Sequence, residues 1–369
     1  MDRVKPREDT DALRPRAPSD DERRALEDWL DDGLRRGERG RLRAEYPISM
    51  GAGPEAHRAV FAGGEPVAHA MWHATEVVGR GRLPVALVGN VYTAPSQRGR
   101  GLASACVEAC VGAARDRGLP LALLWSDAPD WYARLGFHPV GRERFVSLDA
   151  GSLARARCSD RPLEVGEPRD GDWPELERLY AAKPQHVARG PGDLARLAAA
   201  PDCDLCVARE GGRALAYAAA GRGDDMQGVV HEWAGVADGV LACVAWLEER
   251  AGAHTLLSGP TPEPPVPRLR ASGATSREGP FALARILDPE ALWRCLAPDE
   301  RGLAFERGDR GLRLRSGAEA CELEAAAALE LLFGSGARGT LAASLPDSVA
   351  ARIADRLPWP LYLWGFDSI

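Results

Sequence analysis

A cluster of arginine and glycine residues stands directly before an apolar segment of helical character. Its members are Arg98, Gly99, Arg100, Gly101, Leu102 and Ala103. The start of a helix exposes unpaired backbone N–H groups and the positive end of the helix dipole. Positions with little or no side chain let a phosphate reach those N–H groups, and the two arginines add positive charge. The cluster predicts a cradle for a pyrophosphate, with a simple glycine turn as the alternative.

The segments on either side of this cluster are expected to position it. Residues 83–93 are nearly all apolar and contain β-branched valines, which predicts a central strand covered on both faces. Residues 101–117 carry apolar side chains at helical spacing, and residues 119–127 predict a second buried strand. A loop between a strand and a helix lies at the carboxyl edge of the sheet, where open α/β sheets bind ligands.

The length of 369 residues favours two or three domains. The first unit is expected to begin with a capped helix at residues 19–36 and to close its own sheet with a last strand at residues 142–148. A weak repeat of the same order follows, beginning with two strands around a glycine turn at residues 203–221. The predicted parts are a disordered N-terminus at 1–18, and domains at 19–155, 156–288 and 289–369.

The first unit resembles the GNAT superfamily of N-acetyltransferases. Residues 98–103 match its R-x-x-G-x-G/A acyl-CoA signature, and WYARLGFHPVGR at 131–142 is similar to its later Y-x-x-x-G-F segment. The whole layout resembles the enhanced-intracellular-survival (Eis-like) acetyltransferases. That resemblance implies an α/β fold with two GNAT-like mixed-sheet domains in tandem and a small α+β C-terminal domain of the sterol-carrier-protein type.

The resemblance also implies a cofactor and a mechanism. Acetyl-CoA would be the co-substrate, with its pyrophosphate on residues 98–103 and its pantetheine arm along the backbone of Val91, Tyr92 and Thr93. Tyr132 matches the tyrosine acid of the superfamily, and it can hydrogen-bond or protonate the leaving sulfur. The alternative is a tyrosine that only packs a short helix.

The general base is harder to assign, because residues 83–93 carry no acidic side chain. Asp127, Asp130 and Glu143 are nearby in sequence, with simple solvated acids as the alternative, and His73 is a further candidate. The Eis-like resemblance implies another base, the terminal carboxylate of Ile369. The apolar tail at 361–369 would be poorly solvated if free, so it is expected to dock. A carboxylate shielded from water is also a stronger base than one in water.

Several further side chains are expected to line an acceptor pocket, although aromatic residues of this kind often belong to the core. They are Trp72, His73, Asn90, Trp125 and Asp127. The second unit has Gly235 and Gly239 but no neighbouring arginine, and Leu269 stands where the first unit has Tyr132. It is therefore predicted to bind no acetyl-CoA. No cluster of His, Asp or Glu has metal-ligand spacing, so no metal is expected.

Composition narrows the class of protein. A net charge of −7 argues against nucleic-acid and polybasic membrane surfaces. No segment has the length of an apolar membrane span or the form of a secretory signal, and the eight cysteines are scattered, so a cytoplasmic protein with free thiols is expected.

The expected activity is transfer of acetyl from acetyl-CoA to a primary amine of a small molecule or an exposed lysine. A CoA-binding scaffold or sensor without turnover is the alternative, and a longer acyl donor and a homo-oligomer are left open.

Overall fold

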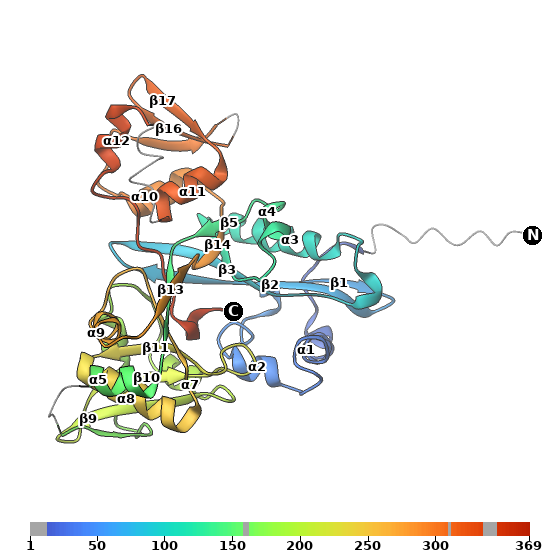
Figure 1. The fold of residues 1–369 in the computed structure, drawn as a ribbon. Coiled ribbons are helices and arrows are strands. Elements are labelled where there is room, and N and C mark those ends of the chain that lie inside the picture. The colour runs from blue at the N-terminus through green and yellow to red at the C-terminus, as the bar shows by residue number, and fades with distance from the viewer. Residues whose placement is uncertain (1–12, 158–161, 309–310, 335–344) are drawn as a thin grey trace, which may run out of the picture.

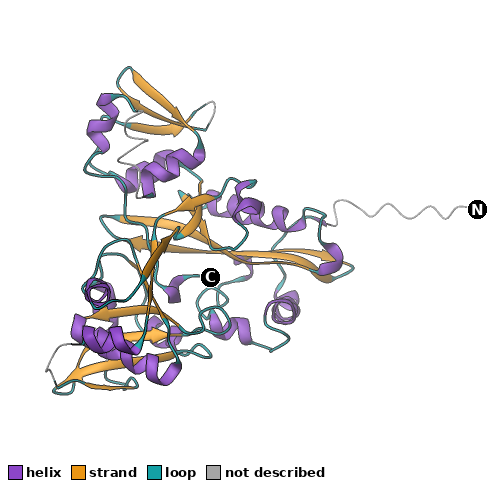
Figure 2. Ribbon diagram, viewed as in Figure 1, coloured by secondary structure: helices purple, strands orange, loops and turns teal. Residues whose placement is uncertain are grey.

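The computed structural model describes residues 13–157, 162–308, 311–334 and 345–369. Figure 1 shows two units, each built on a sheet, and a smaller third part above them. The tail that follows the third part returns between the two sheets, so that the C-terminus lies between the first and second units (Figures 1 and 2).

The first sheet has the order β1-β2-β3-β4-β14-β5, with β8 paired to β2. Its only parallel pair within the described chain is β3 with β4. The strands are β1 (His57–Ala62), β2 (Glu65–Val78), β3 (Arg82–Thr93), β4 (Leu121–Leu124), β5 (His138–Val140), β8 (His186–Val187) and β14 (Ala282–Ile286).

Helices cover both faces of this sheet because its strands alternate apolar side chains. Ala70 and Trp72 belong to the core under α3 (Leu102–Asp116), whereas Met71 belongs to the core under α1 (Asp20–Leu34). Ser19 caps α1 with a capping box, as its sequence predicts. Shorter elements complete this unit: α2 (Arg41–Glu45), η2 (Pro54–Ala56), η3 (Pro95–Gln97) and α4 (Pro129–Ala133).

The second sheet has the order β13-β6-β12-β11-β10-β9-β7. Its strands are β6 (Glu143–Ser147), β7 (Glu164–Gly166), β9 (Asp204–Glu210), β10 (Arg213–Ala220), β11 (Val229–Gly235), β12 (Thr255–Ser258) and β13 (Ser276–Gly279). The helices of this unit are α5 (Ala150–Ala156), α6 (Trp173–Ala181), α7 (Asp193–Ala198), α8 (Ala237–Ala251) and α9 (Pro265–Ala271).

The two sheets exchange one strand each. β6, expected as the last strand of the first sheet, pairs with β12 and β13 in the second sheet. β14, which comes from the second half of the chain, pairs with β4 and β5 and so lies between them in the first sheet. Local apolar pattern indicates a strand but not its partner, so the sequence could not show this exchange.

The third part contains a three-stranded antiparallel sheet in the order β15-β16-β17. Its elements are α10 (Pro289–Leu296), β15 (Ala304–Arg307), β16 (Leu312–Ser316), β17 (Glu319–Leu323), α11 (Ala325–Phe333) and α12 (Asp347–Ile353). The tail beyond it ends in η5 (Gly365–Asp367).

The disorder expected for residues 1–18 was wrong for residues 13–18. Arg16 exchanges two backbone hydrogen bonds with Ala59 of β1, at 3.0 and 2.8 Å, and Pro18 is buried. The hydrogen bonds to β1 compensate for the conformational entropy that this segment loses when it becomes ordered. The composition of the segment does not reveal these partners. Residues 1–12 lie outside the described part of the chain.

Candidate active site

The two central strands of the first sheet separate at one end. β3 pairs with β4 at Val85–Leu121, Ala86–Ala122 and Leu87–Leu123, and the pairing stops there although β3 continues to Thr93. On its other side, β3 stays bonded to β2 through a bulge opposite residues 69–71. The main chain of Val91, Tyr92 and Thr93 is thus left without a partner strand on the β4 side.

The loop that follows β3 presents an open helix start at this edge. Gly99 and Gly101 have φ of +78° and +75°, and a Cβ on either would meet no atom within 4 Å. Gly101 is the N-cap of α3, and no side chain caps this helix. The first helical hydrogen bond runs from Ala105 N to Gly101 O, so the N–H groups of residues 102–104 precede the helical ladder.

The polar side chains around the loop are buried or hydrogen-bonded within the protein. The Thr93 hydroxyl oxygen is buried without a hydrogen-bond partner among the described residues. Arg98 Nε donates to Thr93 O at 3.4 Å, and Arg100 is hydrogen-bonded to Gln97. The Tyr92 ring instead packs on Trp29 at 4.8 Å, so only the main chain of Tyr92 is offered to the separated edge.

Tyr132 lies on α4 in the apolar cluster that contains Leu102 and Leu124, at the start of α3 and the end of β4. It is 8% exposed, and its hydroxyl makes no hydrogen bond to another described residue. Burial, with a contribution from Asp127, raises the pKa of Tyr132 to about 12. The phenol therefore stays protonated at neutral pH and is able to donate a hydrogen bond.

The chain end lies on the opposite face of β3. A Cβ built on Gly89 would meet the main-chain oxygen and carbon of Ile369 at 2.7 and 2.8 Å. The predicted docking of the tail is confirmed, because Leu361, Tyr362 and Leu363 are buried, as are Trp364 and Phe366. Gly89 stands two residues before Val91, so the terminal carboxyl group lies beside the edge where β3 leaves β4.

A cavity of about 520 Å³ adjoins this chain end. It is walled by β2, by the segment after α2, by residues 187–197 of the second half and by the tail. Its polar lining includes Tyr46, Ser49, His73, Glu76, Arg189, Asp193 and Ser368, together with Ile369 and Asp367. The Asp367 carboxylate is paired with Arg189 at 2.7 Å, and the carboxylates of Glu76 and Asp193 are paired with Arg82 and Arg196.

His73 is the one residue of the predicted acceptor pocket that lines this cavity. Burial lowers the pKa of His73, and Asp193 and Asp367 oppose the shift. Its neighbour Trp72 points to the other face of β2, where its indole donates to Glu55 O at 3.2 Å within the core under α3. Period-two alternation thus excludes Trp72 from the pocket.

The other predicted pocket residues lie elsewhere. Trp125 packs edge-on against Phe281 with ring centroids 5.4 Å apart, and Asp127 is exposed near Tyr132. Asn90 lies in the bulge of β3 with φ of +50°, and its carbonyl is within 2.8 Å of His69 Nδ1. None of the three lines the 520 Å³ cavity.

The equivalent edge of the second sheet is filled. β11 pairs with β12 only at Val229–Thr255 and Val230–Leu256, and beyond that point the Trp233 indole donates to Leu257 O at 2.9 Å. The Trp364 ring from the tail packs on Trp233 at 5.2 Å. Gly235 ends β11 and lies two residues before α8. A Cβ added to Gly235 would collide with the backbone of β10. Protein atoms therefore occupy the space that the first sheet leaves open.

The sequence did not identify most of the residues that line the cavity. Tyr46, Glu76, Arg189 and Asp193 come from three separate segments, and none lies in a recognisable motif. Their placement depends on packing between the two halves, for which the sequence holds no local signal.

Comparison with known proteins agrees with this geometry. Residues 49–140 match the acetyltransferase (GNAT) domain family. The fold is similar to that of a GCN5-related N-acetyltransferase from Kribbella flavida (18% identity, TM-score 0.67) and one from Anabaena variabilis (14%, 0.70). It is also similar to Eis1 from Mycobacterium abscessus (19%, 0.61). Each alignment covers 97% of this chain and 100% of the other. Among curated proteins, no significant match was found.

The predicted fold class, α/β with two mixed-sheet GNAT-like units in tandem, is confirmed. The sterol-carrier-protein likeness of the third part stays a prediction. No helix in the described ranges is both long and apolar enough to cross a membrane.

Proposed function

We propose that this protein is an acetyl-CoA-dependent N-acetyltransferase that acts on a primary amine of a small molecule or an exposed lysine. The observation that carries the proposal is the coincidence of two features at one sheet edge: β3 unpaired on its β4 side beyond Leu87, and the uncapped, glycine-led start of α3. A pyrophosphate suits the helix start, and an extended arm with amide groups suits the strand edge.

The residues at this edge fit the donor. Gly99 and Gly101 leave room for the diphosphate, and Arg98 and Arg100 supply charge at the mouth of the loop. The main chain of Val91–Thr93 offers hydrogen bonds to the pantetheine arm on the side where β4 no longer pairs with β3. Leu102 and Ala103 form the first turn of α3, where their N–H groups face the same ligand.

The cavity beside the chain end fits a cationic acceptor. The terminal carboxylate brings negative charge to a lining whose one arginine is already paired with Asp367 and Glu232, and the lining carboxylates Glu76 and Asp193 are paired with Arg82 and Arg196. An amine that enters such a cavity is attracted as its ammonium form and must lose a proton before it can attack.

The proposed reaction follows from these positions. The Ile369 carboxylate takes a proton from the ammonium group, and the neutral nitrogen attacks the thioester carbonyl carbon. The new C–N bond forms, the C–S bond breaks, and the nitrogen loses its second proton to water. Tyr132 donates a hydrogen bond to the departing sulfur; with a pKa of about 12, above the ~8.5 of a thiol, it stabilises the thiolate without giving up its proton.

The test is release of free thiol from acetyl-CoA with a panel of polyamines, aminoglycosides and lysine peptides. Saturable turnover that is lost in Tyr132→Phe, with the KM for acetyl-CoA little changed, is the expected result. Binding of acetyl-CoA without turnover on any acceptor would instead favour the CoA-binding scaffold or sensor. Parallel assays with longer acyl-CoA donors measure the length of acyl group that the site accepts.

A further inference from the structure

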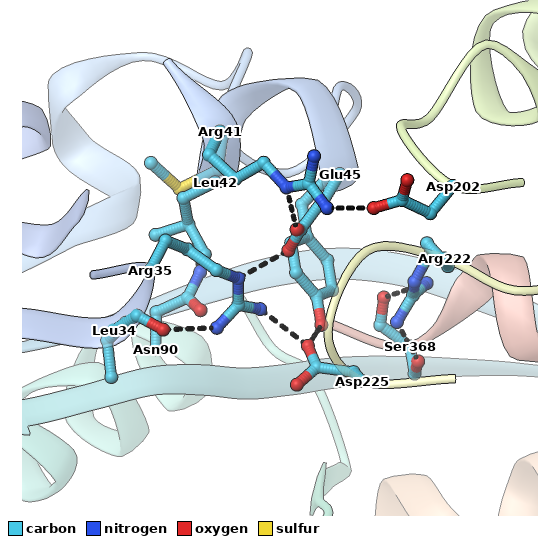
Figure 3. Close-up of polar contacts among 12 residues, drawn as sticks. Leu34, Arg35, Arg41, Leu42, Glu45, Asn90, Asp202, Arg222, Asp225 and Ser368 are labelled. Atoms are coloured by element: carbon cyan, nitrogen blue, oxygen red, sulfur yellow. Dashed lines mark hydrogen bonds and ion pairs between the residues drawn. The ribbon is translucent and has the colours of Figure 1, made fainter. Parts of the chain in front are cut away.

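Arg222 grips the last turn of the chain from the loop between β10 and β11. Arg222 is 2% exposed, and its guanidinium donates from Nη1 to Gly365 O at 2.6 Å and to Ser368 O at 3.3 Å. Nη2 donates to Ser368 Oγ at 2.7 Å (Figure 3). A second-half arginine thus holds the residue that immediately precedes the terminal carboxylate.

This buried cation has no acidic side-chain partner. In the described chain, no Asp or Glu lies within ion-pair distance of Arg222, and its Nε atom is buried without a hydrogen bond. A buried guanidinium is costly unless an anion compensates it. Here the carbonyl oxygens of Gly365 and Ser368 take that place, and in the described structure Arg222 forms no ion pair with the carboxylate of Ile369, the residue that follows Ser368.

Two arginines hold adjacent residues of the tail. Arg189 donates to both oxygens of Asp367, at 2.7 and 2.9 Å, while Arg222 holds Ser368. Gly89 of β3 then meets Ile369 itself. Consecutive residues are therefore fixed by different elements, which leaves the terminal carboxyl group little freedom.

The loop that carries Arg222 is in turn fixed to the first half. The guanidinium lies over the ring of Tyr46 at 4.3 Å, and the Tyr46 hydroxyl is hydrogen-bonded to Asp225 of the same loop. Arg35 joins Asp225 to the fully buried Glu45, at 2.5 Å to each (Figure 3). Movement of the first half relative to this loop would therefore move the chain end.

We propose that Arg222 is a positioning residue that aims the Ile369 carboxylate at the acceptor amine. It acts through the carboxylate and touches neither substrate. The inference rests on the proposed function, in which that carboxylate is the base.

The experiment compares Arg222→Met and Arg222→Lys with Arg209→Met. Arg209 is a matched control, since it is a buried arginine of the second half, bonded to Asp172 and remote from the tail. Both Arg222 variants should lower kcat by roughly 10- to 100-fold, with the KM for acetyl-CoA within about twofold of the parent. Arg209→Met should unfold more easily but keep its kcat. Equal kcat in the Arg222 variants and the control would overturn the proposal.

A second arm places each variant in a protein whose C-terminus is converted to an amide by ligation. If Arg222 acts through the carboxylate, its replacement should cause no further loss of kcat in the amidated protein. Losses that multiply would show that Arg222 acts by another route.

The parent protein with an amidated C-terminus distinguishes the role of the terminal carboxylate as base from the role of Arg222. Full activity there removes the terminal base from the proposed function. Loss of activity there, with normal kcat in both Arg222 variants, overturns only the role of Arg222. Arg222→Lys keeps the positive charge but cannot reproduce the paired contacts with Gly365 and Ser368. It therefore still tests the positioning role if Arg222→Met does not fold.

Discussion

Replacement of Gly89 by alanine displaces the terminal carboxyl group with a single methyl group. Gly89 lies in β3 and does not have the left-handed backbone conformation, so alanine is compatible with its main chain. The new Cβ would stand 2.7 Å from the Ile369 main-chain oxygen, whereas carbon contacts are comfortable from about 3.5 Å. The chain end must therefore retreat by about 0.8 Å.

A misplacement of this size is large for a proton acceptor. A shift of about 1 Å in a reacting group can cost about 100-fold in rate, which corresponds to ~2.7 kcal/mol in the activation free energy. The tail should remain docked, because Trp364 and Phe366 pack on Trp233 and His231 well before the end. We expect kcat to fall by between 10- and 100-fold while the free energy of unfolding changes by less than about 1 kcal/mol.

The assay is thiol release at saturating acetyl-CoA, with urea unfolding measured on the same preparations. Gly166→Ala is the matched control, because Gly166 also lies in a strand and a Cβ there would meet no atom within 4 Å. A kcat for Gly89→Ala within about twofold of the parent would refute the reasoning, since the carboxylate would then have moved without consequence.

Three further outcomes are expected. Gly101→Ala puts a side chain at φ of +75°, which costs about 1–2 kcal/mol, so the KM for acetyl-CoA should rise roughly tenfold in steady-state assays. Titration calorimetry should find one acetyl-CoA per chain, and two would contradict the filled edge of the second sheet. Burial lowers the pKa of Lys183 to about 8, from ~10.4 when unfolded. Between these values the unfolded chain holds more protons, so this group makes the free energy of unfolding rise with pH, and the parent-minus-Lys183→Met difference in urea unfolding should show that rise.

Part of the site could be predicted from short stretches of sequence because it is locally encoded. Gly99 and Gly101 adopt the positive φ that glycine favours, and α3 starts where the apolar spacing begins. His73 was identified as a cavity residue, but its neighbour Trp72 was not excluded. The sequence showed both on one strand without showing which face the core would take.

The sequence by itself determined the open loop and the strand before it, since backbone conformation there depends on neighbouring residues alone. Only the tertiary structure decided that β6 and β14 change sheets, because strand partners are chosen by packing and not by local pattern. It likewise decided that Ile369 meets Gly89, 280 positions earlier in the chain, and that Arg222 is hydrogen-bonded to Ser368. Contacts across such separations arise when distant apolar surfaces are buried together, and no short sequence motif encodes that burial.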